Sequence, residues 1–279
     1  MHRLIPFTMN THPTAQRNEG TKTPLMLLAS LIGGALFLAT SLLAVNAAPP
    51  AANVSFASGP EKVSLVELYT SEGCSSCPPA DRWLSGISEG DELWKKVVPV
   101  AFHVSYWDRL GWPDRFAQRE FDTRQRRLAA RADSGVYTPG MFKDGAEYRS
   151  WRRTPPNEVA EQSRPAAAGE LTISRVEGNE WVVTYEPANP TTKPDQVFAA
   201  VLGNKLSNAV ARGENAGRRL DHDFVVLQLE RAALNKSSAD AQTLQARFTL
   251  DTDVTEHPAL AAWVTNGSGQ PLQAVGGAL

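Results

Sequence analysis

The sequence predicts an α/β domain followed by a small all-β sandwich-like domain. Between residues 61 and 165, apolar runs of strand length alternate with segments of helical period. After Gly169, short apolar or alternating segments are separated by turn signals, with no long helical period. We therefore expect an α/β domain over residues 61–165 and a β domain over residues 169–279, with residues 48–60 as a linker rich in Ala and Pro.

The α/β part is expected to begin as strand, helix, strand. Residues 63–70 form a nearly continuous apolar, β-prone run. Pro78 and Pro79 open the helix, because the missing N–H of proline costs nothing at the first helical position. Residues 97–104 predict a second strand, parallel to the first if the helix crosses over. Further along the chain we expect a helix over 114–132, a strand over 136–142 with a hairpin after it, and β-domain strands over 171–176, 181–185, 197–202, 224–229, 244–250 and 260–264.

Residues 1–47 have the pattern of a signal peptide or a membrane anchor. Three basic residues precede an uncharged apolar run over residues 25–45, and small residues follow it. We expect the rest of the chain to be periplasmic or secreted, held at the inner membrane only if this segment stays uncleaved. The formal net charge is −2, so no strong basic field favours nucleic acid as a partner.

The chain has two cysteines, Cys74 and Cys77, three positions apart. A scaffold held by disulfides would need more of them, and two cysteines alone do not complete a tetrahedral zinc site. They follow a predicted strand and precede a proline-led helix, which is the setting of a thioredoxin-type dithiol. A helix start favours a thiolate, the attacking species in disulfide exchange. We assign Cys74 as the nucleophile and Cys77 as the resolving thiol.

This pattern predicts an exported thiol–disulfide oxidoreductase that needs no dissociable cofactor and no metal. Its partners would be protein or small-molecule thiols and disulfides, including a redox partner protein. Two alternatives stay open. One is a binding or interaction protein in which Cys74–Cys77 is a structural disulfide, and the other is a carrier of copper(I) or another soft metal on two thiolates.

Four residues are expected to support the dithiol. Ser75 and Ser76 can donate hydrogen bonds to a thiolate. Thr138-Pro139 begins the strand that leads into the expected hairpin, and in thioredoxin-like folds a cis-proline loop at this place faces the dithiol. We therefore expect the Thr138-Pro139 peptide bond to be cis.

His103 ends the second predicted strand, at the edge of the sheet where α/β sites gather. One interpretation gives His103 or Asp108 the handling of protons beside an aromatic wall that includes Trp107. The other makes this region a hydrophobic cap on the sheet, with His103 satisfied by a backbone partner, and we favour it for His103. We expect the arginines of residues 124–131 to form a solvated helix face rather than an anion site. Residues 212–218 are polar and rich in glycine, and they can form a functional loop or connect a β-hairpin; we favour the hairpin. His222 follows them with no evident partner.

Several segments resemble a bacterial family of exported proteins of unknown function with a thioredoxin-like N-terminal part. The segments are residues 67–81, 102–108, 110–112, 136–139 and 212–218. The resemblance implies an α/β thioredoxin-like domain, with a helical insertion between the second strand and Pro139, followed by the small all-β sandwich-like domain. It implies no substrate.

Overall fold

The computed structural model describes residues 54–160, 166–238, 240 and 242–279. Strands hold 43% of these residues and helices 19%. The expected signal peptide or anchor, residues 1–47, lies outside the described residues. Within the described ranges, no helix has both the length and the apolar character needed to cross a membrane.

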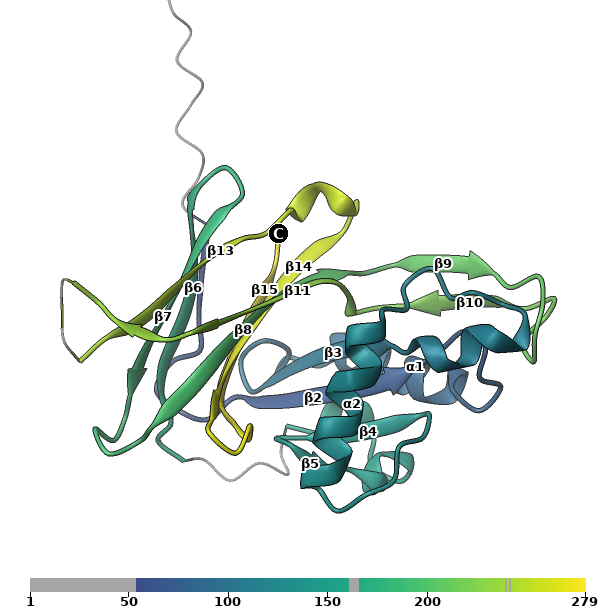
Figure 1. Cartoon of the computed structure of the whole chain (residues 1–279), viewed down its shortest axis with the longest axis horizontal. Coiled ribbons are helices and arrows are strands. Elements are labelled where there is room, and N and C mark those ends of the chain that lie inside the picture. Colours follow the sequence, from purple (N-terminus) through teal and green to yellow (C-terminus); the bar gives the residue numbers. More distant parts are fainter. Residues whose placement is uncertain (1–53, 161–165, 239, 241) are drawn as a thin grey trace, which may run out of the picture. The chain divides into compact units, whose positions relative to one another are not determined.

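Two α-helices and fifteen strands make up the described chain, together with five 3₁₀ turns (Figure 1). In chain order they are β1 (Ser55–Ala57), β2 (Ser64–Thr70), α1 (Pro78–Ser85), η1 (Gly86–Glu89), β3 (Val97–His103), η2 (Ser105–Leu110), α2 (Arg119–Arg131), β4 (Gly140–Lys143), β5 (Ala146–Glu147), η3 (Arg149–Arg152), η4 (Pro156–Glu158), β6 (Gly169–Glu177), β7 (Glu180–Pro187), β8 (Pro194–Gly203), β9 (Leu206–Ala209), β10 (Arg219–His222), β11 (Val225–Ala233), β12 (Asn235–Lys236), β13 (Leu244–Thr249), η5 (Thr252–Val254), β14 (Pro258–Asn266) and β15 (Pro271–Ala278).

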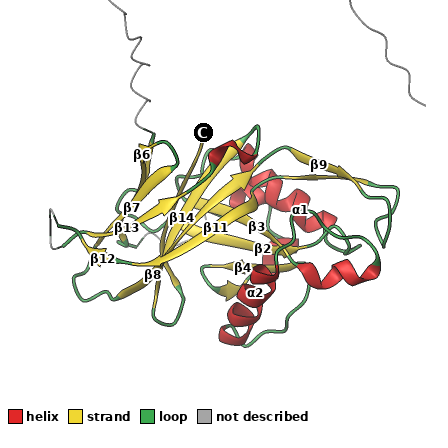
Figure 2. Ribbon diagram, turned by 45° about the horizontal axis from the view of Figure 1, so that its top comes forward, coloured by secondary structure: helices red, strands yellow, loops and turns green. Residues whose placement is uncertain are grey.

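One eight-stranded sheet takes strands from both halves of the chain, in the order β15-β14-β8-β11-β3-β2-β4-β5. Figure 2 labels β14, β8, β11, β3, β2 and β4 of this sheet. β2 and β3 are parallel, as expected, and β4 pairs with β2 in the antiparallel sense. The join between the two halves is the parallel contact of β11 with β3, where Val225 lies opposite Ala101. A second sheet has the order β1-β6-β7-β13-β12, and β9 and β10 pair only with each other.

The eight-stranded sheet is covered on both faces. On one face, α2 packs Phe121 and Leu128 against Tyr69 of β2 and Trp263 of β14. Because side chains alternate along a strand, the neighbouring residues of the same strands point to the other face. There α1 covers β2 and β3, and the five-stranded sheet covers β8, β14 and β15.

The fold class predicted from the sequence, an α/β thioredoxin-like domain followed by a small all-β sandwich-like domain, is wrong. The described chain is mostly β-sheet with few helices. The physical reason is the β3–β11 pairing, which joins the expected α/β part and the expected β part into a single sheet. Ser55–Ala57 also differs from expectation, since this part of the expected linker pairs with β6 as β1.

The two helices begin where local chemistry allows it. α1 starts at Pro78, as expected, and buries Ala80, Trp83 and Leu84 on one face. α2 starts at Arg119 and not at Asp114, because the Asp114 carboxylate accepts a hydrogen bond from the Phe116 N–H and so closes a turn of its own.

Candidate functional site

A disulfide joins Cys74 and Cys77 in the turn between β2 and α1, with the two Cα atoms 5.5 Å apart. Both cysteines are fully buried, while Ser75 and Ser76 between them are exposed. The Ser76 hydroxyl lies 3.3 Å from Cys74 Sγ, within hydrogen-bonding distance for sulfur. The four residues 74–77, all expected in the site, thus form one turn. Its two serines face solvent and its two sulfurs are buried.

The N-terminus of α1, which follows this turn, offers fewer backbone hydrogen-bond donors to a thiolate than expected. Pro78 and Pro79 occupy the first two helical positions and have no N–H. The N–H of Ser75 is already bound, since it donates to Glu214 Oε2 at 3.0 Å. A Cys74 thiolate would therefore rely on the helix dipole and on Ser76 rather than on free backbone donors.

The segment between β9 and β10 covers the disulfide turn. Asn215, which is fully buried, donates through Nδ2 to the carbonyl of Glu72 at 2.8 Å and to the carbonyl of Cys74 at 2.9 Å. Arg218 in turn donates to Asn215 Oδ1 at 2.7 Å and fixes the amide. Residues 212–218 do connect a hairpin, as predicted, and that hairpin also clamps the cysteine turn.

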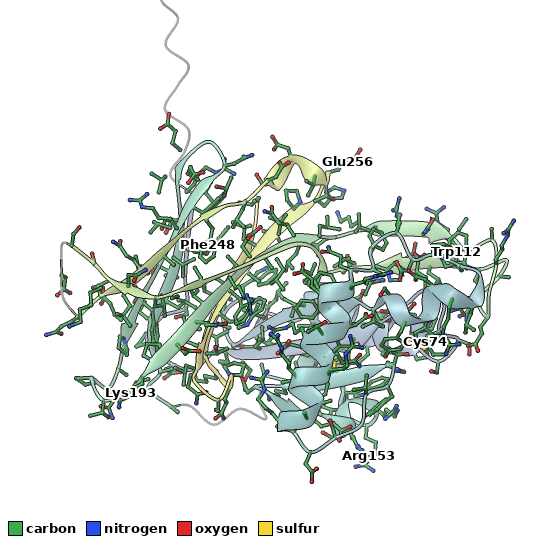
Figure 3. The ribbon with its side chains drawn as sticks, in the orientation of Figure 1. Cys74, Trp112, Arg153, Lys193, Phe248 and Glu256 are labelled. Carbon is green, nitrogen blue, oxygen red and sulfur yellow. A yellow bond between two sulfur atoms is a disulfide. The ribbon has the colours of Figure 1, made fainter. Side chains whose placement is uncertain are left out.

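A cluster of buried acids and imidazoles lies beside the disulfide. Its members are Glu72, Asp81, His103, Asp114 and His222. Glu72 Oε2 accepts hydrogen bonds from Trp112 Nε1 at 2.8 Å and Asn208 Nδ2 at 2.9 Å. Figure 3 shows Trp112 and Cys74 at the same end of the molecule. The described residues include no group of three or more His, Cys, Asp or Glu side chains arranged to hold a metal ion.

His103 and Asp114 form the tightest pair of this cluster, with Nδ1 2.6 Å from Oδ2 and both side chains fully buried. Burial acts to lower the pKa of His103, but the charge and hydrogen bond of Asp114 outweigh it, so the pKa is raised. Burial acts to raise the pKa of Asp114, but His103 and the N–H groups of Glu72 and Phe116 bring it below its usual value. The partner of His103 is thus a carboxylate and not the backbone group that we favoured.

His222 of β10 reaches into the cluster from the other side. Its ring meets the His103 ring edge to face at 4.9 Å between centroids. His222 Nε2 lies 3.3 Å from Glu72 Oε1, and Nδ1 lies 4.0 Å from Asp81 Oδ1. Burial raises the pKa of Asp81, which also accepts a hydrogen bond from Thr70. Glu72 Oε1, His103 Nε2 and both His222 ring nitrogens have no hydrogen-bond partner among the described residues.

The Thr138-Pro139 peptide bond is cis, as predicted. Tyr69 pairs with Gly140, so the register of β2 and β4 brings Pro139 beside the end of β2, where the cysteine turn begins. Trp107 connects the two segments, because its Nε1 donates to Thr138 Oγ1 at 2.8 Å and its Cβ lies against Gly73. A Cβ at Gly73 would come within 3.1 Å of Trp107 Cβ, so a side chain there would require Trp107 to shift by a few tenths of an ångström.

Asp108 contacts the buried cluster at Asp114. Its Oδ1 accepts the N–H of Asp114 at 3.1 Å, and partial burial raises the pKa of its carboxyl group. Asp108 is thus linked to the cysteine turn through Asp114, which accepts the N–H of Glu72 at 2.9 Å.

Replacing Glu214 with glutamine is expected to raise the reduction potential of the Cys74–Cys77 pair by about 10–20 mV. Glu214 places a negative charge at the N–H of Ser75, and this charge disfavours a thiolate in the reduced form. Equilibration with glutathione buffers measures the shift. Glu256→Gln, which changes an exposed carboxylate well away from Cys74 in Figure 3, is the control and should leave the potential unchanged. A potential that is unchanged or lower in Glu214→Gln would contradict this electrostatic account.

A family model described as "Protein of unknown function (DUF1223)" matches residues 65–265. The chain belongs to this family. The matched range runs from β2 to β14, so the DUF1223 segment includes the cysteine turn, the buried cluster and the β9–β10 hairpin. No curated protein matches the chain.

Two solved structures share the fold. One is a crystal structure of protein AGR_C_4864 from Agrobacterium tumefaciens, with a TM-score of 0.53 and 24% identity, covering 77% of this chain and 94% of that chain. The other is HBP35 of Porphyromonas gingivalis, with a TM-score of 0.59 and 17% identity, covering 78% of this chain and 76% of that chain. At these identities the likeness concerns the fold alone.

Sequence reasoning missed most of the groups around the disulfide. Asp81, Asp114, Glu214 and Asn215 were not singled out, and His222 had no evident partner. Asn215 lies in the polar, glycine-rich segment 212–218, for which the sequence favours a hairpin connection over a functional loop, and no local pattern links it to Cys74. A buried role for His222 becomes evident only when β10 is placed beside the end of β2.

Proposed function

We propose that this protein is an exported thiol–disulfide oxidoreductase that uses Cys74 and Cys77. The observation that carries the proposal is the disulfide itself, which closes a solvent-facing turn directly before a helix and beside a buried group of titratable side chains. The Cα atoms of the two cysteines, 5.5 Å apart, are at the usual separation for a disulfide.

In the reaction, the thiolate of Cys74 attacks one sulfur of a substrate disulfide. A mixed disulfide forms between Cys74 and the substrate, and the other substrate sulfur leaves as a thiolate. Cys77 then attacks Cys74 Sγ, which releases the second substrate thiol and closes the Cys74–Cys77 disulfide. Two electrons pass to the substrate, and the two protons of the dithiol end on the substrate thiols. A dithiol partner protein would return this protein to the reduced form.

The surroundings favour the reducing direction. Glu214 and Glu72 place carboxylates beside the turn, and Pro78 and Pro79 withhold two backbone donors. Both features disfavour a thiolate, so they stabilise the disulfide relative to the dithiol and lower the potential. The buried acids and histidines lie where protons of the dithiol can be taken up and returned.

A binding role with a structural disulfide is the second candidate. Two observations favour it: both cysteines are completely buried, and Asn215 binds the carbonyl of Cys74. In this arrangement neither cysteine has surface that a thiol reagent can reach.

We expect a Cys77→Ser variant to trap a mixed disulfide through Cys74 with a small thiol-reactive disulfide probe. A Cys74→Ser variant should trap far less, because Cys77 is the resolving thiol. The potential of the wild-type pair should fall within about −200 to −270 mV, the range of the reducing relatives. A potential well below about −300 mV, together with no trapping by either variant, would leave the structural disulfide as the function of the pair.

A further inference from the structure

A cavity of about 340 Å³ lies between α2 and the α2-facing side of β8, β11 and β14. On α2, the lining residues Thr123, Arg124, Arg127 and Arg131 recur at helical spacing and so form one face. The sheet contributes Phe198 and Leu229 from β8 and β11. The cavity does not include the cysteine turn, and it has no part in the thiol chemistry proposed above.

The floor of the cavity is apolar and is fixed by aromatic stacking. Phe198 stacks on Trp263 with 5.3 Å between the ring centroids, and the Arg124 guanidinium lies over Phe198 at 4.8 Å. The positive charge of Arg124 is compensated by Glu67, whose Oε2 lies 2.9 Å from Arg124 Nε and 2.8 Å from Nη2. The expectation that this arginine belongs to a solvated helix face is therefore wrong, since its side chain is only 16% exposed and pairs with buried Glu67.

The other three arginines of the cavity keep their charge uncompensated. Arg231 lies directly opposite Phe198 in the β8–β11 register, so both side chains face α2. In the part of the chain that the structure describes, Arg131 donates only to the backbone carbonyls of Arg127 and Ser268. Among the described residues, Arg127, Arg131 and Arg231 have no carboxylate at ion-pair distance.

A glycine lies beside the Arg131 guanidinium. Gly269, in the turn between β14 and β15, has φ +76°, and a Cβ there would lie 1.4 Å from Arg131 Nη1. The absence of a side chain at Gly269 leaves room for the Arg131 guanidinium beside the turn.

Two carboxylates also border the cavity. Burial raises the pKa of Glu120, Glu230 raises it further, and Arg231 opposes this shift. The second carboxylate is Asp195, near the start of β8. Three uncompensated guanidinium groups against these two acids leave a positive cavity with an apolar floor.

We propose that this cavity binds a small molecule that joins an oxyanion, carboxylate or phosphate, to an apolar group. Guanidinium groups bind such oxyanions through paired N–H donors, and here Arg127 and Arg231 supply them from opposite walls. Phe198 and Leu229 contact the apolar group, and the volume suits a ligand of small-molecule size.

Calorimetric titration with phenyl phosphate, inorganic phosphate and phenol tests the proposal on the full chain. Phenyl phosphate should bind with a Kd of about 1 mM or tighter, inorganic phosphate about tenfold more weakly, and phenol not measurably. Arg127→Gln and Arg231→Gln should each weaken phenyl phosphate binding about tenfold, because each removes one charged donor. Arg126→Gln, an exposed arginine of α2 that does not line the cavity, is the matched control and should bind as the wild type does.

Absence of saturable phenyl phosphate binding to the wild type would overturn the proposal, and so would equal losses in Arg126→Gln and Arg127→Gln. Equal affinities for phenyl phosphate and inorganic phosphate would overturn the role of the apolar floor. Thermal unfolding of each variant establishes that it is folded. If Arg127→Gln does not fold, Arg127→Ala takes its place, with the same expected loss.

Discussion

Replacing Asp114 with asparagine is expected to lower the free energy of unfolding by about 3 kcal/mol near pH 6. Asp114 is buried and binds His103 Nδ1, the Glu72 N–H and the Phe116 N–H with its two carboxylate oxygens. An asparagine has one acceptor oxygen and turns an NH₂ group towards donors. At least one buried group therefore loses its partner.

The loss should depend on pH, with a sign that follows from the two pKa directions. The raised pKa of His103 gives stability that is complete below about pH 6.5, its unfolded value, and is lost as the pH rises through the folded value. The lowered pKa of Asp114 gives stability that is present above about pH 3.9, its unfolded value, and is lost as the pH falls through the folded value. The difference between wild type and variant should therefore be greatest between about pH 4 and 6.5 and smaller on either side.

Urea unfolding at a series of pH values measures this profile. Asp221→Asn, an exposed aspartate of β10, is the control and should change stability by less than about 0.5 kcal/mol. A loss in Asp114→Asn that is the same from pH 4 to pH 9 would show that the charge pair with His103 contributes nothing and that only the backbone hydrogen bonds matter.

The second large effect is expected for Arg124→Leu, which should destabilise the protein by about 3–5 kcal/mol. The substitution leaves Glu67 as an uncompensated buried carboxylate, with Tyr69 as its remaining hydrogen-bond partner. It also removes the guanidinium that lies over Phe102, Phe198 and Trp263. Arg124 therefore contributes through both charge and stacking.

A double variant separates these two contributions. Glu67→Gln combined with Arg124→Leu removes the unpaired charge and should recover about half of the loss, as seen in urea unfolding midpoints. Arg126→Leu, on the exposed side of the same helix, should change stability by less than about 0.5 kcal/mol. If the double variant is no more stable than Arg124→Leu alone, the unpaired carboxylate is not the cause of the loss.

The sequence predicts what is local in this fold. The order of β2, the cysteine turn, α1 and β3 follows from apolar runs, two prolines and a short connection, and all of it was found. The hairpin over residues 212–218 was also predicted from local turn chemistry. These features depend on neighbours within about one helical turn or one hairpin, so periodicity and propensity are enough to predict them.

What the sequence did not predict depends on contacts between distant residues. The β3–β11 pairing of Ala101 with Val225 decides the fold class, and no local pattern selects one apolar strand as the neighbour of another. Asp114 and His222 become members of the site only through their packing around His103. Arg124 lies in an arginine-rich helical segment that predicts a solvated face. It pairs instead with Glu67, a carboxylate of β2.

The position of β11 also has a consequence for how the chain folds. β3 lies between β2, which precedes it closely, and β11, which follows it by more than a hundred residues. The last strand contributes as well, because Gln273 of β15 accepts the N–H of Val63 at 2.8 Å. Contacts of such long sequence separation give the chain a high contact order and slow folding. The cysteine turn likewise reaches its final surroundings only after the β9–β10 hairpin has been synthesised, because Asn215 of that hairpin binds the Cys74 carbonyl. Until then the two thiols lack this cover and are open to other thiols and to oxidants.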